Sequence, residues 1–152
     1  MINIRNAEVT EHEILSEIAF KAEAYLGYDD DYMNKFKAIY KVSEKFIREN
    51  LTVVMEDDRK IVGFYGLINS ETETSLEYFF IEPDYIGRGF GRILWSYLEK
   101  DCKEHCINKL SIVTSPQSKN FYVKMGAVIC GEVESLLRRG RKIPQLIWFC
   151  KN

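Results

Sequence analysis

The sequence predicts an α/β protein of the α+β type, built on a single mixed β-sheet with helices on both faces. Segments with the spacing of strands alternate with segments with the spacing of helices along the chain. Consecutive strands in the first half are typical of hairpins, whereas the second half interleaves strands with helices like a parallel β-α-β unit. The length suits one domain over residues 1–152, because a chain of this size can bury its own core.

The first elements are expected to be a short strand and a helix. Residues 2–5 alternate between apolar and polar side chains, which is typical of a strand. Thr10 stands three residues before Glu13, the spacing of a capping box that starts a helix. Apolar residues then recur at helical spacing, and Gly27 is expected to end this helix.

A second helix and three strands are expected next. The aspartates at 29–31 are in position to cap the helix, and residues 43–50 either continue it or form a separate turn. Residues 51–55 and 61–68 are rich in β-branched and apolar side chains on either side of an Asp-Asp turn, which predicts a hairpin. Residues 74–81 form a third long strand.

The rest of the chain predicts a β-α-β arrangement with a final pair of strands. A glycine-rich turn at residues 86–91 leads into a helix, whose expected inner face carries Ile93, Leu94, Tyr97, Leu98 and Cys102. The remaining elements are expected at 110–114 (strand), 117–125 (helix), 128–133 (strand) and 146–150 (strand).

Composition and charge exclude several classes of protein. A formal net charge of −2 gives no overall attraction to nucleic acid or an anionic membrane, so neither is expected as a partner. No apolar run approaches a membrane span, and the first residues lack the apolar core of a signal peptide. We therefore expect a cytoplasmic protein with reduced thiols. Cys102, His105 and Cys106 supply at most three ligands, so no metal is expected.

The glycine turn is the segment most informative about function. Gly87, Gly89 and Gly91 alternate with larger residues between a strand and an amphipathic helix. Alternating glycines let backbone N–H groups converge, and the start of the helix adds unpaired N–H groups and a positive dipole end. The pattern predicts a cradle for phosphate, flanked by Arg88 and Arg92, although a purely geometric turn stays open. The spacings of the dinucleotide fingerprint and the P-loop are both absent.

Residues 79–92 resemble motif A of the GCN5-related N-acetyltransferases (GNAT family). In that motif Arg/Gln-x-x-Gly-x-Gly/Ala follows a strand ending in Val/Ile-x-Pro. The matching positions are the two required glycines and three accompanying residues, namely Gly89, Gly91, Gly87, Ile81 and Pro83. Ile86 departs from the motif, because it stands where Arg or Gln is usual.

Residues 114–127 resemble motif B of the same family, often Asn-x-x-Ala-x-x-Phe-Tyr-x-Lys-x-Gly-Phe. Four positions match and three depart: Phe121, Tyr122, Lys124 and Gly126 match, while Ser115, Ser118 and Ala127 stand where Asn, Ala and Phe are usual. The residues agree with a helix that Ser115 caps and Gly126 ends. Together the two motifs carry the resemblance over roughly residues 51–125.

The resemblance implies a GNAT-like sheet that is mostly antiparallel, with a central strand, glycine loop and helix. It implies an N-acyltransferase that moves an acetyl group from acetyl-coenzyme A to a primary amine by direct attack, without a metal. The backbone N–H of Ile81 would stabilise the oxyanion. Coenzyme contacts are implied for both motifs, at Phe79, Ile81, Ile86, Gly87, Arg88, Gly89, Phe90, Gly91, Arg92, Ser115, Lys119 and Asn120.

Tyr122 and Glu77 are the candidate catalytic residues. A tyrosine hydroxyl near the sulfur can protonate the departing thiolate, although by residue type alone Tyr122 would be interpreted as a core residue. Strand periodicity places Glu77 on the same face as Phe79 and Ile81, where apolar surroundings would raise its pKa and suit it to act as the base. A surface-facing Glu77 is equally compatible with the sequence.

The acceptor is the least defined part of the prediction. It is an amine of a small molecule or a peptide, and a homodimer is compatible with the sequence. The acidic and aromatic residues 25–32 suit a cationic amine, and the basic residues 138–142 suit a carboxylate, but both segments are also typical of solvated surface. The alternative function is a non-catalytic module of the same fold that binds acyl-coenzyme A.

Overall fold

A computed structural model of the chain describes residues 1–151, which form a seven-stranded sheet with helices. The strands are β1 (Ile2–Asn6), β2 (Leu51–Asp57), β3 (Lys60–Asn69), β4 (Thr74–Ile81), β5 (Lys109–Val113), β6 (Val128–Glu134) and β7 (Lys142–Phe149). The α-helices are α1 (His12–Ala24), α2 (Asp30–Ile39), α3 (Glu44–Glu49), α4 (Phe90–Glu104) and α5 (Lys119–Lys124). None of these helices is both long and apolar enough to cross a membrane.

The strand order is β1-β2-β3-β4-β5-β7-β6. Only β4 and β5 run parallel, while the other neighbouring strands of the described sheet run antiparallel. This confirms the mixed, mostly antiparallel sheet. Within the described residues, β4 and β5 pair only at Ser75–Ser111 and Leu76–Ile112, so the two strands separate towards the end of β4.

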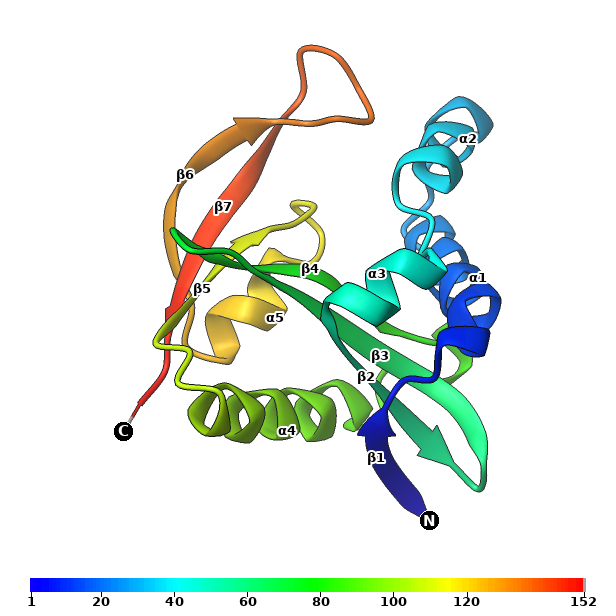
Figure 1. Cartoon of the computed structure of the whole chain (residues 1–152). Coiled ribbons are helices and arrows are strands. Elements are labelled where there is room, and N and C mark those ends of the chain that lie inside the picture. The colour runs from blue at the N-terminus through cyan, green and yellow to red at the C-terminus, as the bar shows by residue number, and fades with distance from the viewer. Residues whose placement is uncertain (152) are drawn as a thin grey trace.

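Helices cover both faces of the sheet, as the sequence predicted (Figure 1). On one face, Leu94 and Leu98 of α4 pack with Tyr65 of β3. On the other face, the apolar stripe of α1, which includes Leu15, packs with α2 and with Phe64. Adjacent residues of a strand point to opposite faces, which is why Phe64 and Tyr65 belong to different cores.

The start of α1 differs from the prediction. The backbone N–H of Glu8 donates to Glu11 Oε1 at 2.8 Å, and a 3₁₀ turn at Val9–Glu11 precedes the helix. The capping box predicted for Thr10 and Glu13 is therefore wrong. Glu11 is held in place because its carboxylate also binds the guanidinium of Arg5 at 2.7 Å.

The structure also defines two element boundaries and the buried face of α4. Ser43 caps α3 as a separate helix, since its hydroxyl accepts the N–H of Phe46 at 3.0 Å. In α4, Ile93 is 40% exposed whereas Trp95 is 1% exposed. The prediction that Ile93 belongs to the inner face is therefore wrong, and Trp95 is buried instead. Strand β7 begins at Lys142, earlier than expected, because β6 pairs with it as far as that residue.

Candidate functional site

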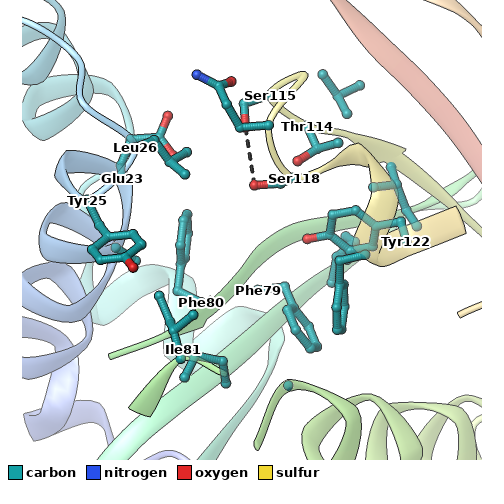
Figure 2. Close-up of a pocket in the computed structure, with 18 of the residues that line it drawn as sticks. Glu23, Tyr25, Leu26, Phe79, Phe80, Ile81, Thr114, Ser115, Ser118 and Tyr122 are labelled. Carbon is teal, nitrogen blue, oxygen red and sulfur yellow. Dashed lines mark hydrogen bonds between the residues drawn. The ribbon is translucent and has the colours of Figure 1, made fainter. Parts of the chain in front are cut away.

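A cavity of about 550 Å³ occupies the opening between β4 and β5. Its walls come from α1, α2, the end of β4, the glycine turn, the segment after β5, α5 and the loop between β6 and β7. Figure 2 shows Tyr122 on one side of this space, Glu23 and Tyr25 on the opposite side, and Phe79 and Ile81 along the wall that joins them. Helix α5 and the end of α1, which are far apart in the sequence, therefore line one cavity.

The end of β4 presents its backbone to this opening. On the β3 side, the N–H of Glu82 donates to the carbonyl of Val62 at 2.8 Å. Backbone groups of successive residues in an antiparallel strand point alternately to the two sides, so those of Phe79 and Ile81 point away from β3. Because β5 has separated from β4 here, these N–H and C=O groups face the cavity.

A β-bulge in β4 changes the position predicted for Glu77. Gly66 pairs with Tyr78 while the next residue, Leu67, pairs with Leu76, so Glu77 is the extra residue of the bulge. Its charge acts on Tyr78 and on Tyr40, both of which pack in the core opposite to Phe79. The prediction that period two keeps Glu77 on the face of Phe79 and Ile81 is therefore wrong. Glu77 still lines the cavity, and burial raises the pKa of its carboxyl group.

The glycine turn has the geometry of an anion cradle. Gly87 and Gly89 have φ angles of +81° and +83°, in the left-handed region that favours glycine, and a Cβ atom on either would meet no atom within 4 Å. Among residues 1–151, no backbone or side-chain acceptor lies within standard hydrogen-bond distance and angle of the N–H groups of residues 87–92. Gly89 caps α4, so the positive end of the helix dipole lies at the same place.

Gly91 serves a different purpose from the other two glycines. A Cβ atom at Gly91 would lie 3.1 Å from the ring of Phe121, which is tighter than ordinary side-chain contacts. Its missing side chain therefore lets the start of α4 approach α5. The motif glycines thus divide into two that shape the turn and one that allows close packing.

The side chains around the turn are divided between the cavity and the surface. Ile86 and Arg92 line the cavity together with the three glycines. Arg88 instead lies over the rings of Tyr85 and Phe90, at 4.9 and 5.5 Å from their centroids. Neither Arg88 nor Phe90 lines the cavity.

Tyr122 combines a packed ring with a hydroxyl that reaches the cavity (Figure 2). Its ring lies edge-on to Phe79 and Trp95, with centroids 6.1 and 5.9 Å away, and the residue is 7% exposed. Burial raises the pKa of the phenol well above its usual value, and the charge of Glu23 adds to the rise. The hydroxyl is therefore protonated at neutral pH.

The segment before α5 departs from the predicted cap. Helix α5 begins at Lys119 with Ser118 at the cap position, whereas Ser115 donates its hydroxyl hydrogen to Ser118 Oγ at 3.2 Å (Figure 2). Ser115 lines the cavity, together with Thr114 and Gln117, but the side chains of Lys119 and Asn120 do not. The structure thus brings Ser115 to the site and leaves the other two predicted motif B contacts outside it.

Glu23 is the site residue that the sequence interpretation missed. It lies four residues after Ala19 on the buried stripe of α1, is 9% exposed and lines the cavity. The hydroxyl of Tyr32 donates to Glu23 Oε2 at 2.8 Å. Burial raises the pKa of this carboxyl group, while Tyr32 and the positive charge of Arg141 partly oppose the rise. The sequence did contain a signal for Glu23, because this acidic residue occupies a position where the helical spacing of α1 predicts an apolar side chain.

The loop between β6 and β7 contacts the segment between α1 and α2 at the edge of this cavity. Arg141 donates to the hydroxyl of Tyr28 at 2.8 Å, and Tyr28 donates to Gln117 Oε1 at 2.9 Å. Arg138 donates to Asp29 Oδ2 at 2.8 Å. The basic segment 138–142, whose composition suits either a carboxylate site or a solvated surface, therefore supplies two arginines to the contact with the α1–α2 segment.

Comparisons with known proteins agree with this geometry. The family model described as an acetyltransferase (GNAT) domain matches residues 18–135. The structure of the PaiA N-acetyltransferase from Thermoplasma acidophilum, in complex with coenzyme A, aligns with a TM-score of 0.81 and 20% identity over 98% of this chain and 99% of that one. No curated protein sequence matches the chain.

Two further solved structures share the fold. The ribosomal-protein-S18-alanine N-acetyltransferase from Escherichia coli aligns with a TM-score of 0.74 and 16% identity, covering 100% of this chain and 96% of that one. An aminoglycoside 6'-N-acetyltransferase complexed with coenzyme A aligns with a TM-score of 0.75 and 16% identity, covering 100% and 98%. At these identities the structures show the fold, and the match to the family model over most of the sequence shows the family. The chain belongs to the GNAT acetyltransferase family.

Proposed function

We propose that this protein is an N-acetyltransferase that transfers the acetyl group of acetyl-coenzyme A directly to a primary amine. The observation that carries the proposal is that two features open onto one cavity: the glycine turn with its unpaired N–H groups, and the hydroxyl of Tyr122. An anion cradle suits the pyrophosphate of coenzyme A, and a protonated phenol suits the thiolate that leaves when its thioester is cleaved.

The coenzyme would be held mainly by backbone groups. The N–H groups of residues 87–92 suit the pyrophosphate, with Arg92 adding positive charge at the cavity wall. The outward-facing backbone of Phe79 and Ile81 suits the amide groups of the pantetheine arm. The N–H of Ile81 is then available to stabilise the oxyanion that forms at the thioester carbonyl.

Proton transfers would involve Glu77 and Tyr122. An alkylamine is protonated at neutral pH, so it must lose a proton before it attacks. Burial raises the pKa of Glu77, which suits this carboxylate to accept the proton through water. As the amine forms its bond to the carbonyl carbon and the carbon–sulfur bond breaks, Tyr122 would donate its hydroxyl proton to the departing sulfur. The proton that the nitrogen loses on becoming an amide would then restore the phenol.

The competing function is a module that binds acyl-coenzyme A without catalysis. Purified protein should be mixed with acetyl-coenzyme A, with and without a panel of primary amines, and free thiol followed over time. We expect thiol release that depends on both protein and amine. Binding of coenzyme A without amine-dependent release for any member of the panel would instead support the binding module.

A further inference from the structure

The half of the cavity away from the glycine turn carries two carboxylates, Glu23 and Glu77. Glu23 lies across the space from Tyr122 (Figure 2). Its Oε2 accepts the hydrogen bond from Tyr32, while its Oε1 takes no hydrogen bond from residues 1–151. Because Oε1 is not among the fully buried atoms that lack a partner, it is accessible from the cavity. A nine-tenths buried carboxylate thus presents an unpaired oxygen to the site.

The two carboxylates and Tyr40 line the same cavity. Burial raises the pKa of Tyr40, and the negative charges of Glu77 and then Glu23 raise it further. The charge of Glu23 is also felt at the hydroxyl of Tyr122, where the sulfur would be protonated. Glu23 therefore lies within electrostatic reach of both the acceptor half and the position of bond breaking.

The charge of this half of the cavity is not fully compensated by the protein. Arg141 lies close enough to Glu23 to lower its pKa in part. Burial raises the pKa of Glu77, and no hydrogen bond or counter-charge from the described residues opposes this rise. A carboxylate removed from water without a counter-charge is costly, so a cation supplied by a ligand would be stabilised here.

We propose that Glu23 binds the ammonium group of the acceptor and selects compact aliphatic amines that carry no carboxylate. This inference rests on the proposed function. The same half of the cavity is lined by apolar and aromatic side chains that suit an alkyl chain and a cation, namely Tyr25, Leu26, Phe36, Tyr40 and Phe80. The bound ammonium would give one proton to Glu77, and the neutral amine would then attack the thioester.

Equilibrium binding tests the proposal without requiring turnover. Butylamine and 4-aminobutanoate, which share a chain length and differ by a carboxylate, should be titrated by calorimetry into protein saturated with coenzyme A. We expect butylamine to bind at least about tenfold more tightly than 4-aminobutanoate. Glu23→Gln, which can still accept the bond from Tyr32, should weaken butylamine binding about tenfold to a hundredfold through loss of one charge-assisted contact.

Two control variants separate this role from a general effect on the fold. Glu17→Gln removes a carboxylate from the exposed side of the same helix, so it should leave butylamine binding unchanged. Tyr32→Phe removes the hydrogen bond to Glu23 but keeps the charge, and it should weaken binding by less than Glu23→Gln.

Three outcomes would overturn the proposal: no binding of butylamine to the coenzyme-loaded protein, equal binding to Glu23→Gln, or equal binding of 4-aminobutanoate. Failure of the proposed function is recognised separately. In that case the protein would not bind coenzyme A, or it would bind coenzyme A and butylamine without releasing thiol from acetyl-coenzyme A.

Discussion

At the scale of single residues, the site depends on side chains that are largely buried but whose polar atoms reach the cavity. Residue type alone favours Tyr122 as a core residue, and its ring does pack against Phe79 and Trp95. What the sequence could not show is that the hydroxyl ends in the cavity. Glu23 was missed for a similar reason, because Tyr32 and Arg141 reach it only after the chain has folded.

The role of Tyr122 is tested by Tyr122→Phe, which keeps the ring and removes the hydroxyl. General acid catalysis contributes about 10²–10⁴-fold in rate, so kcat should fall within that range while coenzyme affinity stays nearly constant. The measurement is kcat under conditions where chemistry limits turnover. Tyr97→Phe, on the same side of the sheet but outside the cavity, should keep its kcat. Wild-type turnover in Tyr122→Phe would leave solvent as the proton source.

At the scale of elements, the order of strands and helices was predictable because each has a clear period and clear end signals. The position of Glu77 was not, because a bulge depends on how β4 pairs with β3, a contact between separate segments. The glycine motif pointed to the turn, but only the structure distinguishes Gly87 and Gly89, with positive φ, from Gly91, which packs against Phe121.

This distinction predicts different results at two glycines. Gly89→Val places a side chain in open space beside the unpaired N–H groups, so it should weaken coenzyme A binding at least about tenfold, with a folding cost of about 1–2 kcal/mol for the left-handed backbone. Gly140→Val carries the same strain at φ +80° in open space outside the cavity, and it should retain coenzyme affinity. Calorimetry would contradict the cradle if both folded variants bound coenzyme A as tightly as the wild type.

At the scale of the whole molecule, one arginine joins two strands at the edge of the sheet to the 3₁₀ turn that precedes α1. Arg5 of β1 donates to Glu11 at 2.9 and 2.7 Å and to Glu56 of β2 at 3.2 Å. These bonds to Arg5 hold the pKa of both carboxyl groups below the ordinary value of 4.5. Their contribution to stability is therefore present above pH 4.5 and is lost as pH falls through the lowered native values.

Arg5→Met should lower the free energy of unfolding at neutral pH by about 1–3 kcal/mol, since it removes charged hydrogen bonds that are partly shielded from water. Denaturant unfolding at several pH values checks this, and the difference from the wild type should shrink below about pH 4. Lys45→Met breaks an exposed pair with Glu49 at 3.9 Å and should have little effect. A difference that stays constant down to pH 3 would show that Arg5 acts through packing alone.

The separation of β4 from β5 also has a consequence for the whole reaction. One cavity joins the glycine turn to the acceptor half, with Tyr122 on one wall and Glu23 on the other, so both substrates have room to be bound together. Direct attack requires such a ternary complex, whereas transfer through an acetylated side chain would let the first product leave before the amine binds.

Initial velocities measured over a grid of acetyl-coenzyme A and amine concentrations test this central claim most directly. With any amine that the thiol-release assay identifies, double-reciprocal plots should give lines that intersect, because both substrates must be bound before either product forms. Parallel lines, together with a protein that becomes acetylated by acetyl-coenzyme A alone, would contradict direct transfer in the cavity.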